Sequence, residues 1–158
     1  MRNLLTLLFI CFSTWAFAQS AGVSLTGEAH DRTLPVDIQA DSLTVNQDNQ
    51  QAVFKGNAKV VQGGLTLSAD EISVKYSEDG SEIELIEARG SVFFSNSAEE
   101  AKSETASYNV PTGDLQMQGS VLLVQGPSQI SGNQLEMNIL SNVAQMTGNV
   151  RTQLVPRN

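Results

Sequence analysis

The chain has 158 residues, of which 17 are Asp or Glu and nine are Lys or Arg, giving a formal net charge of −8. This length supplies about one domain and is enough to bury a real core. The acidic balance argues against nucleic acid and against the phosphates of an anionic lipid surface as partners, because both would repel the protein.

The first 18 residues have the pattern of a secretory signal peptide. Arg2 supplies the positive charge, residues 4–17 form the apolar run, and Ala16-Phe17-Ala18 is a small-x-small cleavage site before Gln19. A membrane anchor is the alternative, although the run is short for a bilayer. We predict cleavage after Ala18, which removes the single Cys and excludes a disulfide framework. The exported chain then carries eight Lys and Arg against 17 Asp and Glu, a net charge of −9.

The rest of the chain divides into three parts. We interpret residues 19–35 as a flexible N-terminal arm, residues 36–155 as the folded domain, and residues 156–158 as a short tail. The arm and the tail fall outside the repeated motifs that organise the domain.

Two motifs alternate through this domain. One centres on a glycine that recurs as Gly56, Gly90, Gly119 and Gly148, and the other starts at Ile38, Leu67, Ala101 and Ile130. Each glycine lies 18 residues after its motif start, except in the second copy, where the distance is 23. A five-residue insertion near Asp79-Gly80 explains the difference, and its default interpretation is a longer hairpin. The pattern predicts about four stacked repeats of 29–34 residues and no dedicated catalytic pocket.

Apolar residues within the repeats alternate with polar ones, which predicts strands with one buried face and one wet face. In the first motif the alternation changes phase between Ala40 and Leu43, and we expect a bulge or a corner there. The recurring glycine likewise predicts a sharp bend or a close approach of the backbone. Each repeat is expected to form two or three short strands. The predicted fold class is all-β, an elongated, twisted, jelly-roll-like β-sandwich or slit barrel. Its interior could be a groove or a packed core, and periodicity alone favours the packed core.

Three stretches within the domain resemble the OstA-like family: residues 36–42, 54–63 and 67–74. The resemblance continues through Tyr108, residues 117–121 and residues 130–135, and so covers about 36–155. It implies a twisted, slightly open β-jelly roll in the periplasm that shelters the acyl chains of lipopolysaccharide. It also implies head-to-tail joining by strand pairing, both to copies of the same chain and to OstA-like domains anchored at the inner and outer membranes.

The resemblance implies lipid contacts at Val36, Ile38, Phe94, Tyr108 and Val110. The alternating apolar stripe adds Phe54, Val92, Val121 and Leu123 as candidate lipid-binding residues. Without the resemblance these side chains would be interpreted as ordinary core.

Other kinds of site have weaker support. Asp41, Asp70 and Asn133 recur about thirty residues apart and form no local metal cage, so bend-stabilising Asx turns are expected there. Glu99-Glu100 is expected on a wet strand face. One His and no Cys in the exported chain favour a non-enzymatic protein without cofactor, metal or catalytic residues. The three functional classes are a lipid-binding bridge, a purely structural exported repeat with no lipid ligand, and an enzyme on a β-scaffold, of which the first is favoured.

Overall fold

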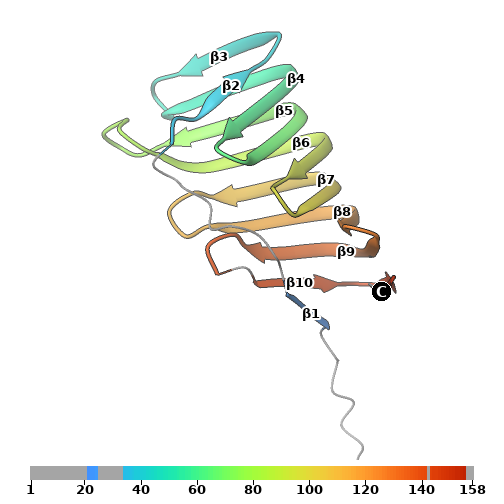
Figure 1. Cartoon of the computed structure of the whole chain (residues 1–158). Helices are drawn as coiled ribbons and strands as arrows, with labels where there is room; N and C mark the ends of the chain where they lie inside the picture. The colour runs from blue at the N-terminus through green and yellow to red at the C-terminus, as the bar shows by residue number, and fades with distance from the viewer. Residues whose placement is uncertain (1–20, 25–33, 142, 156–158) are drawn as a thin grey trace, which may run out of the picture.

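A computed structural model describes residues 21–24, 34–141 and 143–155. The predicted leader and its cleavage site lie outside the described residues. The described chain forms one antiparallel sheet in which most strands pair with their sequence neighbours, and it confirms the all-β, jelly-roll-like fold class (Figure 1). Within this part of the chain there is no helix long and apolar enough to span a membrane.

The strands follow one another down the stack, with the exception of the first. Their bounds are β1 (Ala21–Ser24), β2 (Asp37–Gln39), β3 (Ser42–Asn46), β4 (Gln51–Gln62), β5 (Leu65–Tyr76), β6 (Ile83–Ser95), β7 (Glu99–Asn109), β8 (Asp114–Gln125), β9 (Ser128–Asn138), β10 (Val143–Thr147) and β11 (Arg151–Gln153). The sheet order is β1-β10-β9-β8-β7-β6-β5-β4-β2, with β3 also on β4 and β11 also on β9.

Each repeat has two or three strands, as predicted, but strands β4 to β9 are long and bent, so the predicted shortness is wrong for them. They have 11 to 13 residues each. The pairing register shifts near the middle, as between Lys55 and Ala58 on β4, and regular pairing resumes beyond the shift. A bulge bends a strand without ending its ladder, and this is why one strand continues through each predicted corner.

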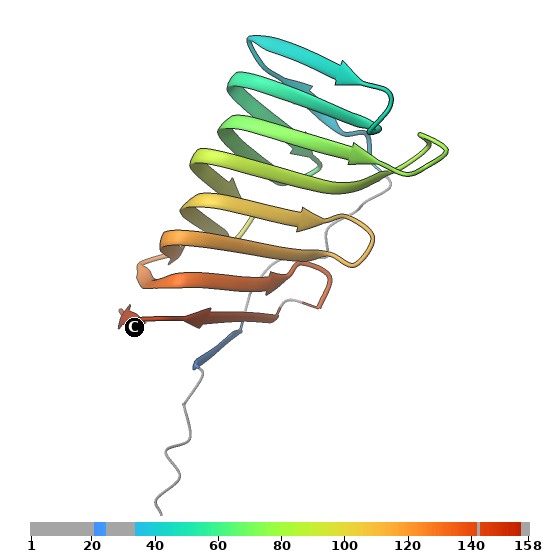
Figure 2. The same cartoon turned by 180° about the vertical axis from the view of Figure 1, so that it is seen from behind.

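The corners fold the sheet into two halves that face each other (Figures 1 and 2). We call them the β3 half-sheet, which runs from β3 to β10 and ends in β1, and the β2 half-sheet, which runs from β2 to β11. The long strands contribute one segment to each half. The hairpin turns of both halves lie on the side away from the corners, which we call the mouth.

The predicted bends at the recurring glycines are confirmed. Gly56 and Asn57 have φ of 77° and 49°, and the same two-residue pattern recurs at Gly90, Gly119 and Gly148 with the residue that follows each. Glycine reaches this left-handed region without the steric penalty of a β-carbon. The corner therefore depends on the glycine that the sequence repeats.

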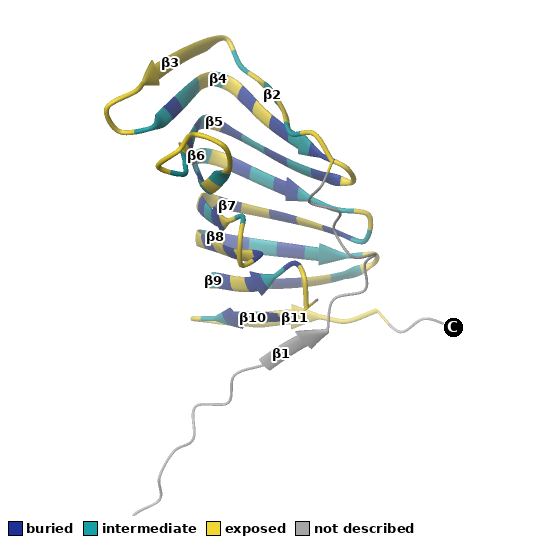
Figure 3. Ribbon diagram, turned by 90° about the vertical axis from the view of Figure 1, so that its left-hand side faces the viewer, coloured by how far each residue is buried: buried dark blue, intermediate teal, exposed yellow. Residues whose placement is uncertain are grey.

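The predicted change of alternation is also confirmed. On β5, Leu67 and Ala69 are buried on one phase and Ile72 and Val74 on the other, so both segments face the interior. Figure 3 shows the same alternation of buried and exposed positions along the strands. The buried apolar residues of both half-sheets form one continuous cluster between them.

The sequence insertion lies in the hairpin between β5 and β6, as predicted. Asp79 accepts hydrogen bonds from the Ser77 hydroxyl at 2.6 Å and from the Ser81 hydroxyl at 2.7 Å. The backbone N–H of Ser81 donates a third bond to the same oxygen at 3.1 Å. These bonds stabilise the carboxylate, with the Ser77 hydroxyl as the largest cause, and lower the pKa of Asp79 to about 2.

Candidate functional site

The nine predicted lipid-binding residues all belong to the inner face of the stack. Five are fully buried, Val92, Phe94, Tyr108, Val121 and Leu123, with exposed fractions of 0–4%. The other four, Val36, Ile38, Phe54 and Val110, are partly buried and pack against the same cluster. The structure therefore separates a closed interior from a partly accessible periphery.

At the mouth, three of these residues meet across the two half-sheets. Val36 from the β2 half-sheet faces Tyr108 and Val110 from the β3 half-sheet around an apolar cavity of about 20 Å³. That volume is close to what one water molecule needs and is far too small for an acyl chain. A lipid entering here has to move the half-sheets apart.

Polar side chains are also buried along the mouth. Gln62 donates a hydrogen bond to the Leu34 carbonyl at 2.9 Å, and Gln125 donates one to Oε1 of Glu99 at 2.7 Å. Glu99 is only 3% exposed, so the expected wet position is wrong for this residue, although Glu100 is exposed. Glu99 lies on the same face of β7 as the buried residues Ala101 and Ser103, and its side chain therefore points inward.

The inner face is accessible at the β3 end of the stack. An apolar hollow of about 360 Å³, which we call the end hollow, is lined mainly by Leu43, Val45, Ala52, Phe54 and Tyr76. Leu43 and Val45 are 54% and 62% exposed, and within the described chain β3 is an edge strand that pairs with β4 alone. Figure 3 shows β3 as an exposed strand at this end. Volumes of this size are typical of small-molecule sites.

Leu43 and Val45 were not among the predicted contacts, although their phase in the first motif could have identified them. They lie opposite Phe54 and Ala52 in the β3–β4 ladder. Of the nine predicted residues, only Phe54 lines this hollow. The structure thus brings together one predicted residue with four that sequence reasoning missed.

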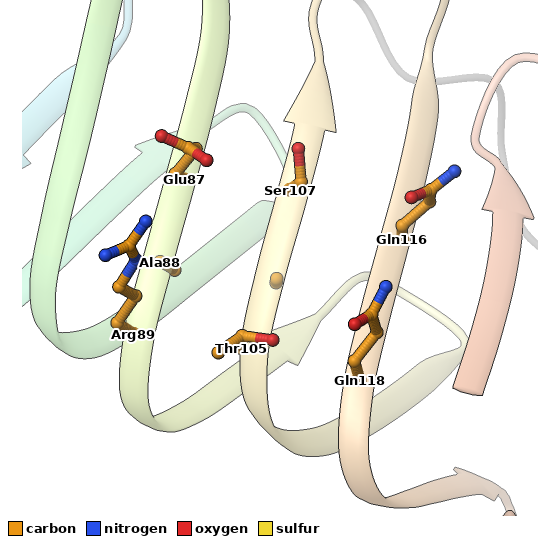
Figure 4. A pocket seen from close by; sticks show the side chains of 8 residues that line it. Glu87, Ala88, Arg89, Thr105, Ser107, Gln116 and Gln118 are labelled. Atoms are coloured by element: carbon orange, nitrogen blue, oxygen red, sulfur yellow. The ribbon is translucent and has the colours of Figure 1, made fainter. Parts of the chain in front are cut away.

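A second hollow, of about 420 Å³, lies on the outer face of the β3 half-sheet and is polar. Figure 4 shows Glu87 and Arg89 from β6 beside Thr105, Ser107, Gln116 and Gln118 from β7 and β8. Its amide, hydroxyl and charged groups do not suit an acyl chain, because burying them without partners is unfavourable.

The recurring acidic residues stabilise the corners. Asn57 donates a side-chain hydrogen bond to Oδ2 of Asp41 at 2.9 Å, and the Ser91 hydroxyl lies 3.4 Å from Oδ2 of Asp70. These contacts cross to the neighbouring strand and differ from the local Asx turn that was expected. No group of three or more metal-ligating side chains occurs among the described residues.

A family model described as "LptA/(LptD N-terminal domain) LPS transport protein" matches residues 37–143. The chain belongs to this family. It is 31% identical over 153 residues to an uncharacterized protein of Rhizobium meliloti (strain 1021), covering 90% of this chain and 82% of that protein. The OstA-like resemblance of the sequence is thereby confirmed.

Two further relatives have names that refer to lipopolysaccharide. The chain is 28% identical over 138 residues to the lipopolysaccharide export system protein LptH of Pseudomonas aeruginosa, covering 86% of this chain and 77% of LptH. It is 31% identical over 112 residues to the LPS-assembly protein LptD of Sodalis glossinidius, covering 70% of this chain but 13% of LptD.

The fold agrees with a solved structure. The crystal structure of LptH, the periplasmic LptA homologue of the lipopolysaccharide transport device of P. aeruginosa, superposes with a TM-score of 0.74. The match covers 80% of this chain and 99% of that chain at 17% sequence identity.

Proposed function

We propose that this protein is a periplasmic carrier that shelters the lipid A acyl chains of lipopolysaccharide and bridges the inner and outer membranes by head-to-tail strand pairing. The observation that carries the proposal is the apolar inner face, which is accessible at the end hollow. Family membership, shared with lipopolysaccharide transport and assembly proteins, supplies the ligand class.

The end hollow offers a route for an acyl chain into the interior. Each methylene removed from water contributes about 0.8 kcal/mol, so a chain of about a dozen carbons contributes on the order of 10 kcal/mol before ordering costs. The backbone contacts between strands in the described chain run only between neighbours along the stack. The two half-sheets therefore meet through side chains at the mouth, where a lipid can separate them while the corners stay joined.

The acidic charge is consistent with a lipid held by its tails. The net charge of −9 of the exported chain repels the phosphate groups of lipopolysaccharide, so headgroup attraction is not the main source of affinity. An acyl chain between the half-sheets leaves the sugar-phosphate part outside the mouth, in water.

The ends of the stack favour joining to similar domains. At one end β2 and β3 are two halves of a bent strand, and at the other β10 and β11 are two halves of another. Strand directions alternate down the stack, so β10 and β11 of one copy are correctly oriented to pair with β3 and β2 of the next. A copy of the domain within LptD would be a matching partner at the outer membrane.

Photo-crosslinking tests the lipid site. A photoreactive residue at Phe54 or Phe94 is expected to capture lipopolysaccharide, because both positions belong to the inner face. The same residue at Lys59, which is exposed on β4, is the matched control. Capture at Lys59 together with none at Phe54 and Phe94 would overturn the proposed site.

The small volume at the mouth favours a second candidate, a purely structural exported repeat with no lipid ligand. The two functions predict different effects of lipopolysaccharide on thermal stability. A ligand that binds only the folded state raises the melting temperature of the protein by mass action. The carrier is expected to show a higher Tm with rising lipopolysaccharide concentration, and the structural repeat an unchanged Tm.

A further inference from the structure

Strand β1 lies at the opposite end of the sheet from the strand that follows it in sequence. Ala21–Ser24 pairs antiparallel with β10, at the C-terminal end of the stack, whereas β2 pairs with β4 at the other end. Figures 1 and 2 show β1 beside β10 from both sides. The stretch predicted as a flexible arm thus contains an edge strand.

This strand covers one half of the C-terminal joint and leaves the other half open. The joint consists of β10 on the β3 half-sheet and β11 on the β2 half-sheet. Within the described chain, β1 adds to β10, whereas β11 pairs only with β9. An uncovered strand edge is a template for another chain, so the two halves of the joint differ in their availability.

We propose that the β10 edge is a strand-accepting site, that Ala21–Ser24 is its resident ligand, and that a second copy of this chain displaces it through β3. This inference rests on the head-to-tail pairing proposed above and adds a competitor to it. A second copy suits this edge because its β3 would run antiparallel to β10, as β1 does.

The register supports the competition. Ala21 lies opposite Met146 and Val23 opposite Ala144, and these are the two buried residues of β10. If a second copy continued the stack, its Leu43 and Val45 would lie opposite Met146 and Ala144. Both residues are exposed on β3, at the other end of the stack.

The second copy offers a longer strand, whereas the resident strand has the advantage of belonging to the same chain. β1 pairs over four residues of β10, and β3 has five residues. A second copy therefore offers a longer ladder, and pairing would bury its exposed Leu43 and Val45. The resident strand protects the edge until such a partner arrives.

The test compares the chain starting at Gln19 with a variant that lacks residues 19–24. We expect faster amide hydrogen exchange within Val143–Thr147 of the variant, and a severalfold lower dissociation constant for self-association in sedimentation. A synthetic peptide of residues 19–26 should restore slow exchange to the variant. Unchanged exchange in the central strands β5 to β8 verifies that the variant folds.

Two proline variants give a matched pair. Neighbouring N–H groups of a strand point to opposite edges, so Gly22→Pro and Val23→Pro place proline once toward β10 and once toward open solvent. The variant whose proline lies toward β10 should reproduce the truncation. The variant whose proline lies toward solvent should behave like the parent chain.

The outcomes separate the two proposals. Equal exchange in β10 with and without residues 19–24, together with no binding of the peptide, overturns the strand-accepting site. Faster exchange, peptide binding and no self-association at any concentration support the strand-accepting site and overturn the head-to-tail pairing on which the competition rests.

Discussion

Asp41 packs directly over Gly56: a β-carbon added to the glycine would overlap Oδ2 of the carboxylate. Gly56 also has a φ of +77°, which side chains rarely adopt. Gly56→Ala is therefore expected to destabilise the fold by about 2–3 kcal/mol, from backbone strain of about 1–2 kcal/mol and a displaced hydrogen bond worth about 1 kcal/mol. Denaturant unfolding measures the loss.

Two other glycines separate these causes. Gly80 has a φ of +70° with open space around it, and Gly64 has open space and no unusual φ. We expect the loss of stability to decrease in the order Gly56→Ala, Gly80→Ala, Gly64→Ala. Equal losses at Gly56 and Gly80 would show that the packing of Asp41 contributes nothing to the corner.

The adjacent aromatics Phe93 and Phe94 provide an internal comparison of the two faces of β6. Phe94 is 1% exposed in the central cluster, whereas Phe93 is half-buried on the other face. Phe94→Ala is expected to lower the free energy of unfolding by about 3–5 kcal/mol, from lost burial and a residual cavity. Phe93→Ala should lower it by clearly less, and a larger loss at Phe93 would contradict the assignment of faces.

The hairpin carboxylate of Asp79 should titrate at unusually low pH. Its pKa is lowered to about 2 by the hydroxyls of Ser77 and Ser81, from an ordinary value of 3.8. Because the folded-state pKa is the lower one, its contribution to stability is present above pH ~4 and is lost as the pH falls through about 2. NMR titration of Asp79 checks the midpoint, and Ser77→Ala should raise it toward 3.8. A midpoint that Ser77→Ala leaves in place would exclude this hydroxyl as the cause.

The sequence predicts the corners well because their cause is local. A glycine with φ > 0 and an alternation that changes phase both leave marks in neighbouring residues, as at Gly56 and between Ala69 and Ile72. The inward phase of Phe94 and Tyr108 follows from the same alternation. These features need no knowledge of what packs against them.

Other features depend on contacts far apart in the chain, and sequence reasoning missed them. The burial of Glu99 rests on the amide of Gln125, 26 residues away. The accessibility of Leu43 and Val45 arises because the stack ends at β3, and period-two alternation does not distinguish an end strand from an inner one. The pairing of Ala21–Ser24 with β10 joins the two ends of the chain, and no local motif marks it.

The end hollow makes a prediction about lipid affinity that is independent of core stability. Leu43 and Val45 are more than half exposed, so replacing both with Ala should change the free energy of unfolding little. If an acyl chain covers them, the double variant loses about 1 kcal/mol of binding free energy at each position, and lipopolysaccharide should bind about 10- to 30-fold more weakly.

Binding is measured by fluorescence at protein concentrations low enough to keep the chain monomeric. Val53→Ala, on the opposite face of β4, is the control and should leave the affinity unchanged. An unaltered affinity in the double variant would place the acyl chains elsewhere on the inner face.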